Sequence, residues 1–209
     1  VYGKGEPPFK ESDQPNPEDP YGIAKYAVEM DLKQASHQFH LDYAIVRPHN
    51  VIGIRQNIWD KYRNVIGIWV RQVLRGEDIT IFGDGEQKRA FSDVRFCLEP
   101  MEKLMDQCNG QIFNIGSDKE YTLNDVAGIM QGMAGEYGFK PNIKHLEERN
   151  EVKYAYCDHT KAKSILGFKD ETSLESTIRE MFVWAMKQDD REVKQMPYEI
   201  EKGMYSYWK

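Results

Sequence analysis

Tyr21-Gly22-Ile23-Ala24-Lys25 places a tyrosine and a lysine one helical turn apart. Residues at positions i and i+4 lie on the same face of a helix, so the phenol and the ammonium group can meet there. A free phenol has a pKa near ~10, and an adjacent ammonium group favours the phenolate and lowers that pKa. The pair therefore predicts a tyrosine that takes a proton from an alcohol while a hydride leaves the carbon. The alternative is an ordinary first-turn tyrosine beside a solvated lysine.

The residues before this pentapeptide determine where the helix begins. Three prolines between positions 15 and 20 disfavour a helix there and favour an extended loop. Asp19 can cap the helix, and Pro20 suits its first position. The helix should run to about Phe39, so that Tyr21 lies at its exposed entry, where a catalytic side chain can face a ligand. Along this helix one small apolar stripe is expected, made of Ala24, Ala27, Val28, Leu32 and Ala35.

The segment 42–47 is short, apolar and β-branched, and it predicts a buried strand. Pro48 and Asn50 follow at its end. Ligands in open α/β sheets bind beyond the carboxyl ends of strands, so Asn50 is a candidate ligand contact. Asn50 could equally satisfy the backbone of a turn, as asparagine often does. Further strands are expected at 79–82 and 111–116. Helices are expected at about 64–75, 122–137 and 174–186, and Trp69 should pack inside the first of these.

The order of the motifs resembles the extended short-chain dehydrogenase/reductase family, in particular NAD-dependent epimerases/dehydratases of the UDP-glucose 4-epimerase type. In that family V-Y-G precedes the tyrosine–lysine helix, and Val1-Tyr2-Gly3 matches it. The segments 47–53, 83–94 and 149–152 resemble the family's R-x-x-N-x-x-G, G-D-G-x-Q-x-R-x-F-x-x-V and R-P-G-(D/E)-V motifs. The sequence departs from the family at Arg95 and Phe96, where an acidic residue is usual. We therefore expect Asp93 to take over the cap of the next helix.

The resemblance implies an α/β fold: the C-terminal part of a doubly wound Rossmann-type sheet plus a smaller α/β substrate-binding lobe. Residues 1–60 would be the remnant of the dinucleotide-binding domain that carries the tyrosine–lysine helix and the following strand. Residues 61–190 would be mainly the substrate-binding lobe, and 191–209 a C-terminal tail. No glycine-rich cofactor turn of the dinucleotide-binding type is present, and Gly83-Asp84-Gly85 is interpreted as a simple turn. The chain is thus expected to be the C-terminal part only, and inactive in isolation.

The resemblance also implies a function. Tyr21 and Lys25 would be catalytic in a nucleotide-sugar epimerase that uses bound NAD, and both would contact the cofactor together with Pro48. Asn50, Arg89 and Arg149 would bind the nucleotide sugar, a UDP-sugar for this type of enzyme. Arginine suits this role because its guanidinium fork pairs with phosphate bidentately. A dehydratase or decarboxylase of the same family remains an alternative, and so does a non-catalytic interaction module.

Composition excludes several other classes. The 28 basic and 34 acidic residues are mixed and give a net charge of −6, so no basic stripe indicates nucleic-acid binding. The sequence contains no run of ~18 apolar residues, so it predicts no membrane span. Three scattered cysteines fit a reducing cytoplasm, and the five histidines lack the spacing of a metal site. A chain with one edge of a parallel sheet would expose apolar edges, so we expect self-association, for example as a homodimer, or stabilisation by a partner strand.

Overall fold

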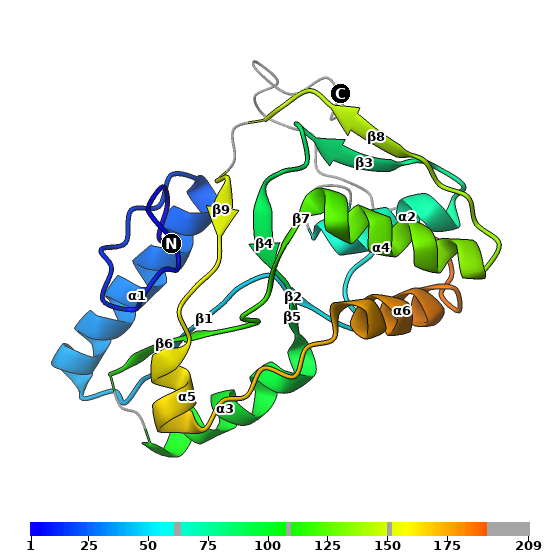
Figure 1. Cartoon of the computed structure of the whole chain (residues 1–209). Helices are drawn as coiled ribbons and strands as arrows, with labels where there is room; N and C mark the ends of the chain where they lie inside the picture. The colour runs from blue at the N-terminus through cyan, green and yellow to red at the C-terminus, as the bar shows by residue number, and fades with distance from the viewer. Residues whose placement is uncertain (61–63, 108–109, 150–151, 192–209) are drawn as a thin grey trace.

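The computed structural model describes residues 1–60, 64–107, 110–149 and 152–191 (Figure 1). The six helices of these ranges are α1 Pro20–Phe39, α2 Val65–Leu74, α3 Val94–Gln107, α4 Leu123–Glu136, α5 Thr160–Leu166 and α6 Leu174–Ala185. The nine strands are β1 Ile45–Pro48, β2 Val51–Ile52, β3 Ile79–Phe82, β4 Lys88–Ala90, β5 Ser92–Asp93, β6 Ile112–Ile115, β7 Glu120–Thr122, β8 Ile143–Leu146 and β9 Tyr154–Ala155. The expected tail at 191–209 lies outside the described residues, apart from Arg191.

Parallel pairing dominates the strands. β1 pairs with β6, β2 with β5, and β3 with β8, all in parallel. β4 is the centre of a three-stranded sheet, antiparallel to β7 and parallel to β9. Parallel pairs require crossover connections, which the helices supply. The predicted α/β fold is confirmed.

Helix α1 begins as the sequence predicts but is buried differently. The Asp19 carboxylate accepts a hydrogen bond of 2.6 Å from the Gly22 amide, and Pro20 occupies the first turn. In the expected apolar stripe, Ala24, Ala27 and Val28 are exposed, whereas Leu32 and Ala35 are half-buried. Helical periodicity identifies the side chains that share a face, and the described residues cover only the C-terminal part of this one.

The larger hydrophobic core lies between α2, α4, α6 and β3, on the right of Figure 1. Trp69 is completely buried there, as expected for a packing residue, and its indole nitrogen donates to the Thr80 carbonyl at 2.7 Å. Ile79 and Ile81 point into this core from β3, and Phe182 does so from α6. Apolar packing therefore fixes these helices against β3 and against one another.

A smaller core covers the β1–β6 pair. Its buried members come from α3, β6 and the α5 region: Cys97, Leu104, Phe113, Ile115, Ala162, Leu166 and Phe168. The β1–β6 pairing brings residues 112–115 back to the part of the chain that contains α1 and β1. The boundary near residue 60 stays a prediction, although the chain crosses between the two regions more than once.

Local motifs account for the element boundaries. Thr122 and Asp125 form a reciprocal capping box at the start of α4, as predicted. The Asp93 carboxylate accepts from the Arg95 amide at 2.8 Å, which gives α3 the expected cap. Gly83 and Gly85 have φ angles of +77° and +79°, which confirms a turn at this glycine pair. Within the described residues, no helix is both long and apolar enough to cross a membrane.

Candidate active site

Tyr21 and Lys25 stand together on the first turns of α1. The Lys25 ammonium lies 5.4 Å from the centroid of the Tyr21 ring, as the spacing of four residues predicts. Tyr21 is 64% exposed and Lys25 is exposed as well. A phenol and a cation are therefore presented to solvent on one helix face. Their catalytic role stays a prediction, which the geometry allows.

Pro48 and Asn50 lie at the carboxyl end of β1, as expected. Pro48 is exposed and is the register partner of Ile115 at the end of β6. Asn50 has a φ angle of +44°, and its side-chain amide donates to the Ala90 carbonyl at 3.0 Å. These contacts match the turn interpretation of Asn50. Its role as a ligand contact remains a prediction, because an asparagine side chain also has a carbonyl oxygen with which to accept.

Arg89 lies in the middle of β4 and is held by main-chain carbonyl groups. Its guanidinium donates to the carbonyls of Lys88 and Lys153 at 2.8 and 3.0 Å, and to that of Val152 at 2.5 Å. These three main-chain oxygens fix the orientation of the guanidinium. The bonds also attach β4 to the segment that leads into β9. The structure thus pre-positions a cation here.

Arg149 lies near the same link between strands. Its guanidinium carbon is 4.4 Å from the centroid of the Phe82 ring, at the end of β3. Phe82 precedes the turn at Gly83 and Gly85, and Arg89 follows it. Because Asn50 bonds to Ala90, the three predicted substrate residues gather around the chain from Phe82 to Ala90. The predicted neighbours Asn150 and Glu151 lie outside the described residues.

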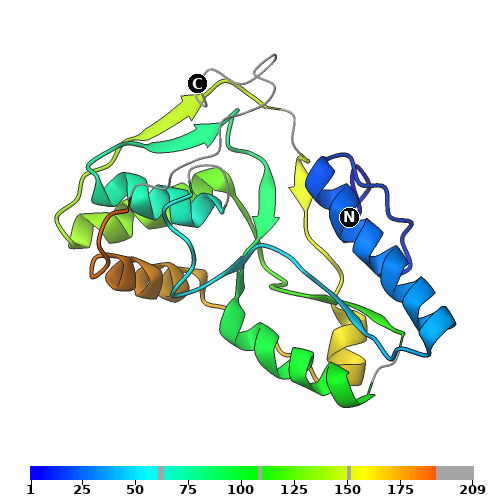
Figure 2. The ribbon, with the colours of Figure 1, turned by 180° about the vertical axis from the view of Figure 1, so that it is seen from behind.

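Helix α1, which carries the tyrosine–lysine pair, lies near β9. β9 pairs with β4, with Ala155 opposite Arg89. Figures 1 and 2 both show β9 beside the N-terminal part of α1, which carries Tyr21. The element that carries the acid–base candidates thus lies beside the strand that pairs with the Arg89 strand.

Sequence reasoning missed a buried ion pair next to this site. Arg47 donates from Nε and Nη2 to the two carboxylate oxygens of Glu29, at 2.8 and 2.6 Å. Its guanidinium also lies over the Tyr2 ring, 4.8 Å from the centroid. The signal was present in the sequence, because Glu29 lies four residues after Lys25 and Arg47 opens the R-x-x-N-x-x-G segment. Nothing in a helical pattern, however, indicates that a glutamate will be buried.

A second missed feature is a pair of stacked histidines. The rings of His49 and His159 lie 4.9 Å apart and 10° from parallel. Gly116 allows this arrangement, since a Cβ at that position would collide with the His49 ring. His159 shares a hydrogen bond of 2.9 Å with the Asp118 carboxylate. Burial and the neighbouring His159 lower the pKa of His49 to about 4, so its ring is neutral at physiological pH.

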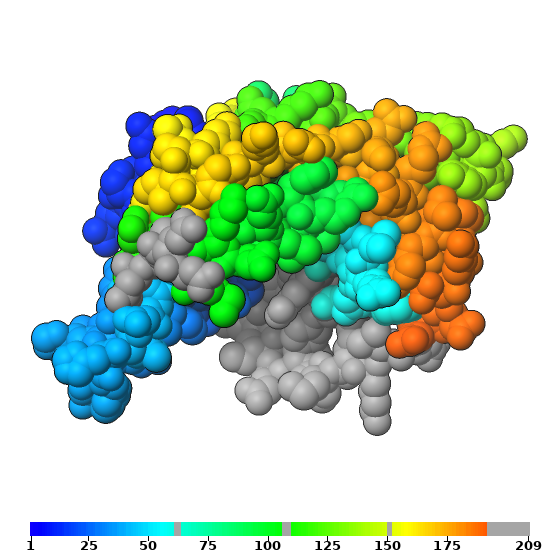
Figure 3. All heavy atoms as spheres, turned by 90° about the horizontal axis from the view of Figure 1, so that it is seen from below, coloured from blue at the N-terminus to red at the C-terminus, as the bar shows by residue number. Residues whose placement is uncertain are grey.

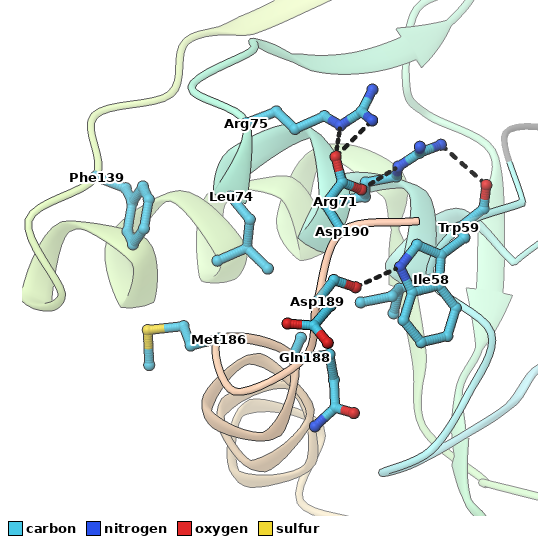
Figure 4. A pocket seen from close by; sticks show the side chains of 11 residues that line it. Ile58, Trp59, Arg71, Leu74, Arg75, Phe139, Met186, Gln188, Asp189 and Asp190 are labelled. Atoms are coloured by element: carbon cyan, nitrogen blue, oxygen red, sulfur yellow. Dashed lines mark hydrogen bonds and ion pairs between the residues drawn. The ribbon is translucent and has the colours of Figure 1, made fainter. Parts of the chain in front are cut away.

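A cavity of about 450 Å³ lies elsewhere, between α2 and the end of α6 (Figure 4). Trp59, Leu74 and Phe139 line it, and the Arg75 guanidinium pairs with Asp190 at its rim. None of the predicted site residues lines this cavity. The candidate residues indicated by the sequence therefore lie away from this cavity. Across the described ranges, no group of three or more His, Cys, Asp or Glu side chains is arranged to hold a metal ion.

The model of the NAD dependent epimerase/dehydratase family matches residues 1–116, more than half of the chain. The chain belongs to this family. The match includes α1, β1 and β4, which carry Tyr21, Lys25, Pro48 and Arg89, and the turn after β1, which carries Asn50. The family match therefore covers five of the six candidate site residues of this epimerase/dehydratase chain, all except Arg149.

Individual relatives agree with this assignment. A putative UDP-glucose 4-epimerase of Methanocaldococcus jannaschii is 35% identical over 195 residues, which cover 91% of this chain and 61% of the relative. A UDP-N-acetyl-alpha-D-glucosaminuronate decarboxylase of Bacillus cytotoxicus is 32% identical and aligns with 88% of this chain and 60% of its own. The crystal structure of a UDP-glucose 4-epimerase of Thermotoga maritima with UDP-glucose superposes with a TM-score of 0.77, at 32% identity, over 90% of this chain and 60% of that one. This epimerase/dehydratase chain thus spans about three fifths of the length of these relatives.

Proposed function

We propose that this chain supplies the acid–base pair and the substrate anchors of a nucleotide-sugar epimerase that acts on a UDP-sugar with NAD. The observation that carries the proposal is the pairing of Tyr21 and Lys25 on the exposed first turns of α1. Its similarity to UDP-glucose 4-epimerases over about nine tenths of the chain supports the choice of reaction.

The residues present fit one end of an NAD molecule. The donor set is suitable, because an exposed ammonium group and an exposed phenol share one helix face, where ribose hydroxyls can accept and donate. Lys25 would hold the cofactor ribose, and Pro48 would line the nicotinamide side. When bound, NAD would supply a hydride acceptor that also returns the hydride. The glycine-rich turn that would hold the pyrophosphate is not among the motifs of these 209 residues.

In this mechanism Tyr21 moves the proton. Its phenolate oxygen accepts the proton of the sugar hydroxyl as the carbon is oxidised, and returns it when the hydride comes back to the other face. The Lys25 ammonium, 5.4 Å from the centroid of the Tyr21 ring, would stabilise the phenolate by charge attraction. Arg89 and Arg149 would bind the diphosphate, and Asn50 would orient the sugar nucleotide. Anchoring the nucleotide leaves the sugar free to turn between the two hydride transfers.

A decarboxylase is the second candidate, because the relative in Bacillus cytotoxicus is a decarboxylase at nearly the same identity. Both reactions begin with oxidation of a sugar hydroxyl, so Tyr21 and Lys25 would serve either. An assay of the complete protein with UDP-glucose and with a UDP-sugar acid separates the two. Interconversion of UDP-glucose and UDP-galactose supports the epimerase, and release of carbon dioxide supports the decarboxylase.

We further propose a cytoplasmic homodimer that binds neither nucleic acid nor membrane and holds no metal. Free thiols at Cys97 and Cys157 support a reducing compartment. The exposed apolar residues of α1, among them Ile23, Val28 and Met30, support a surface that a second subunit covers. Light scattering on the complete protein tests the dimer.

Replacing Tyr21 by phenylalanine tests the proposed function. In the complete protein, Tyr21→Phe removes the proton-accepting oxygen and keeps the ring, so turnover should fall by about 10²–10⁴-fold with little change in UDP-sugar binding. Lys25→Ala should also reduce turnover. Tyr137→Phe, which changes a partly exposed phenol in the larger lobe, is the control and should leave turnover intact. Retention of more than about a tenth of turnover by Tyr21→Phe would make the tyrosine structural.

Arg89 tests the substrate assignment separately. Arg89→Ala should weaken UDP binding by about 1.5–3 kcal/mol, since it removes a charged hydrogen-bonding group from the diphosphate. The same loss should appear for UDP and for the UDP-sugar in calorimetry. Arg75→Ala, which removes a guanidinium paired with Asp190 at the cavity of Figure 4, is the matched control. An unchanged UDP affinity in Arg89→Ala removes this arginine from the site.

A further inference from the structure

We propose that Glu29 and Arg47 are positioning residues, whose buried two-bond ion pair sets where the Tyr21–Lys25 face of α1 stands relative to the carboxyl end of β1. The proposal rests on the proposed function, because it assumes that Tyr21 and Lys25 carry out the proton transfer. Neither Glu29 nor Arg47 is expected to touch the substrate. Each acts through the element that carries it.

Helix α1 has few other buried contacts. Within Pro20–Phe39, which the structure describes throughout, the only buried residues are Gly22 and Glu29. Gly22 lies against its own preceding loop, since a Cβ there would meet Pro17 and Asp19 at 3.1 and 3.5 Å. Figure 3 shows the C-terminal part of α1, in light blue, projecting from the body of the molecule. Tyr26, Leu32, Ala35 and Ser36 are half-buried, so Glu29 is the most deeply buried side chain by which this helix is attached.

The geometry of the pair restricts both translation and rotation. Two nearly parallel hydrogen bonds join the guanidinium fork to both oxygens of one carboxylate, at 2.8 and 2.6 Å. A helix that slid by one residue would break both bonds. Lys25 and Tyr21 precede Glu29 by four and eight residues, or about 6 and 12 Å along the helix axis. The position of Glu29 thus determines the position of both.

The other end of the pair is directly connected to the predicted cofactor and substrate residues. Arg47 is followed at once by Pro48 and, two residues later, by Asn50. It lies on β1, which is paired with β6 in a defined register, with Arg47 opposite Asn114. One ion pair therefore connects the acid–base residues to the strand end where the substrate is proposed to bind.

The Arg47 side chain is itself held in place. Its guanidinium stacks over the Tyr2 ring, and the Tyr2 hydroxyl donates to the Asn114 carboxamide at 2.6 Å. Tyr2 in turn stacks on Phe9, with ring centroids 5.0 Å apart. Burial by itself would lower the pKa of Arg47, but its bonds to Glu29 and Tyr2 outweigh this and raise it, so the guanidinium stays charged. These contacts hold the Arg47 side chain in one orientation, so the ion pair attaches α1 to β1 in a defined direction.

Stability and positioning can be separated by experiment. Replacing a buried ion pair by well-packed apolar residues is often neutral for stability, because the desolvation cost of the charges disappears with them. Apolar contacts, however, are non-directional and would let α1 shift. A double variant, Glu29→Leu with Arg47→Leu, should therefore keep the fold and lose the register.

The experiment uses the complete protein in a cysteine-free background, with spin labels at Lys33 on α1 and Glu102 on α3, both exposed. In Glu29→Leu/Arg47→Leu, the distance distribution between the labels should shift or broaden. Turnover should fall about 10- to 100-fold, with the KM for the UDP-sugar unchanged within about twofold. The matched control is Arg179→Leu/Glu136→Leu, which removes a bidentate but exposed pair between α6 and α4. It should change neither the distances nor turnover.

Each outcome bears on the proposal. An unchanged distance distribution in the double variant overturns it, and so does normal turnover when Tyr21→Phe is impaired. If the double variant does not fold, Arg47→Lys replaces it, because lysine keeps the charge and loses the fork, and the same changes are expected. If Tyr21→Phe itself keeps full turnover, the proposed function fails. The distance measurement then still decides whether the pair positions α1.

Discussion

Helices α6 and α1 are attached to the rest of the molecule by different physical means. α6 buries Leu174, Ile178, Met181 and Phe182 in the larger core, where it contacts α2, α4 and β5. α1 buries one glycine and one carboxylate, and the carboxylate is bonded to Arg47. Apolar burial contributes much stability but little direction, whereas an ion pair contributes direction and little net stability. The comparison suggests that one region stabilises the fold and the other positions a functional face.

The same difference separates the strands. β3 inserts Ile79 and Ile81 into the larger core. At β1 and β6, buried polar side chains stand next to the apolar ones, among them Arg47 and Asn114. The stacked histidines lie just beyond the ends of these two strands. Buried polar side chains are thus concentrated at β1 and β6, next to the predicted site residues Pro48 and Asn50.

The largest expected effect lies in the apolar region. Phe182 is completely buried and contacts the rings of Tyr137 and Phe139, so Phe182→Ala should lower the free energy of unfolding by about 3–5 kcal/mol. Val28→Ala, on the exposed face of α1, should change it by less than about 0.5 kcal/mol. Urea denaturation of both variants measures the difference. Equal effects would mean that a part of the complete protein covers α1 as closely as α6 is covered here.

The next effect is a pH dependence confined to the polar region. The pKa of His49 is about 4 in the folded chain and about 6.5 in the unfolded chain, so between these values the unfolded chain binds more protons. Stability should therefore fall as the pH drops from about 6.5 to about 4, by about 3 kcal/mol in all, and His49 should have no effect at higher pH. The ionisable groups His159, Asp118 and Asp170 act electrostatically on the His49 ring, which makes a difference measurement necessary.

His49→Phe provides that difference, because it keeps an aromatic ring against His159 and removes the titrating group. Its unfolding free energy should depend less steeply on pH than that of the parent chain between about pH 6.5 and about pH 4. The absolute stability of the variant is not the readout, since a larger ring near Gly116 has its own packing cost. Identical pH slopes in the two proteins would show that His49 is not a buried neutral ring.

The smallest expected effect compares the two regions directly, because a helix N-cap is removed in each of them. Thr122→Ala and Asp19→Ala each remove the N-cap of a helix, at about 0.5–2 kcal/mol. The loss at Thr122 should appear in global unfolding, since α4 is part of the larger core. The loss at Asp19 should appear as faster hydrogen exchange confined to the first turns of α1. A global effect of Asp19→Ala would show that α1 unfolds together with the core.

The sequence by itself determined the features that depend on neighbouring residues. Asp19 and Pro20 begin α1, Thr122 and Asp125 cap α4, and the four-residue spacing brings Lys25 to Tyr21, each through contacts within one or two turns. The ordered motifs also indicated the family, which the family model confirms. Such local interactions form in any tertiary setting that allows the helix, so a pattern of residues is enough to predict them.

Only the tertiary structure decided which faces are covered and which distant groups meet. The stripe from Ala24 to Ala35 has helical periodicity, yet Ala24, Ala27 and Val28 are exposed while the charged Glu29 is buried. Glu29 is buried because Arg47, 18 residues away, neutralises it, and Arg89 is oriented by the carbonyls of Val152 and Lys153, more than 60 residues away. Burial of a charge depends on a partner that chain folding supplies, and a local pattern carries no information about that partner.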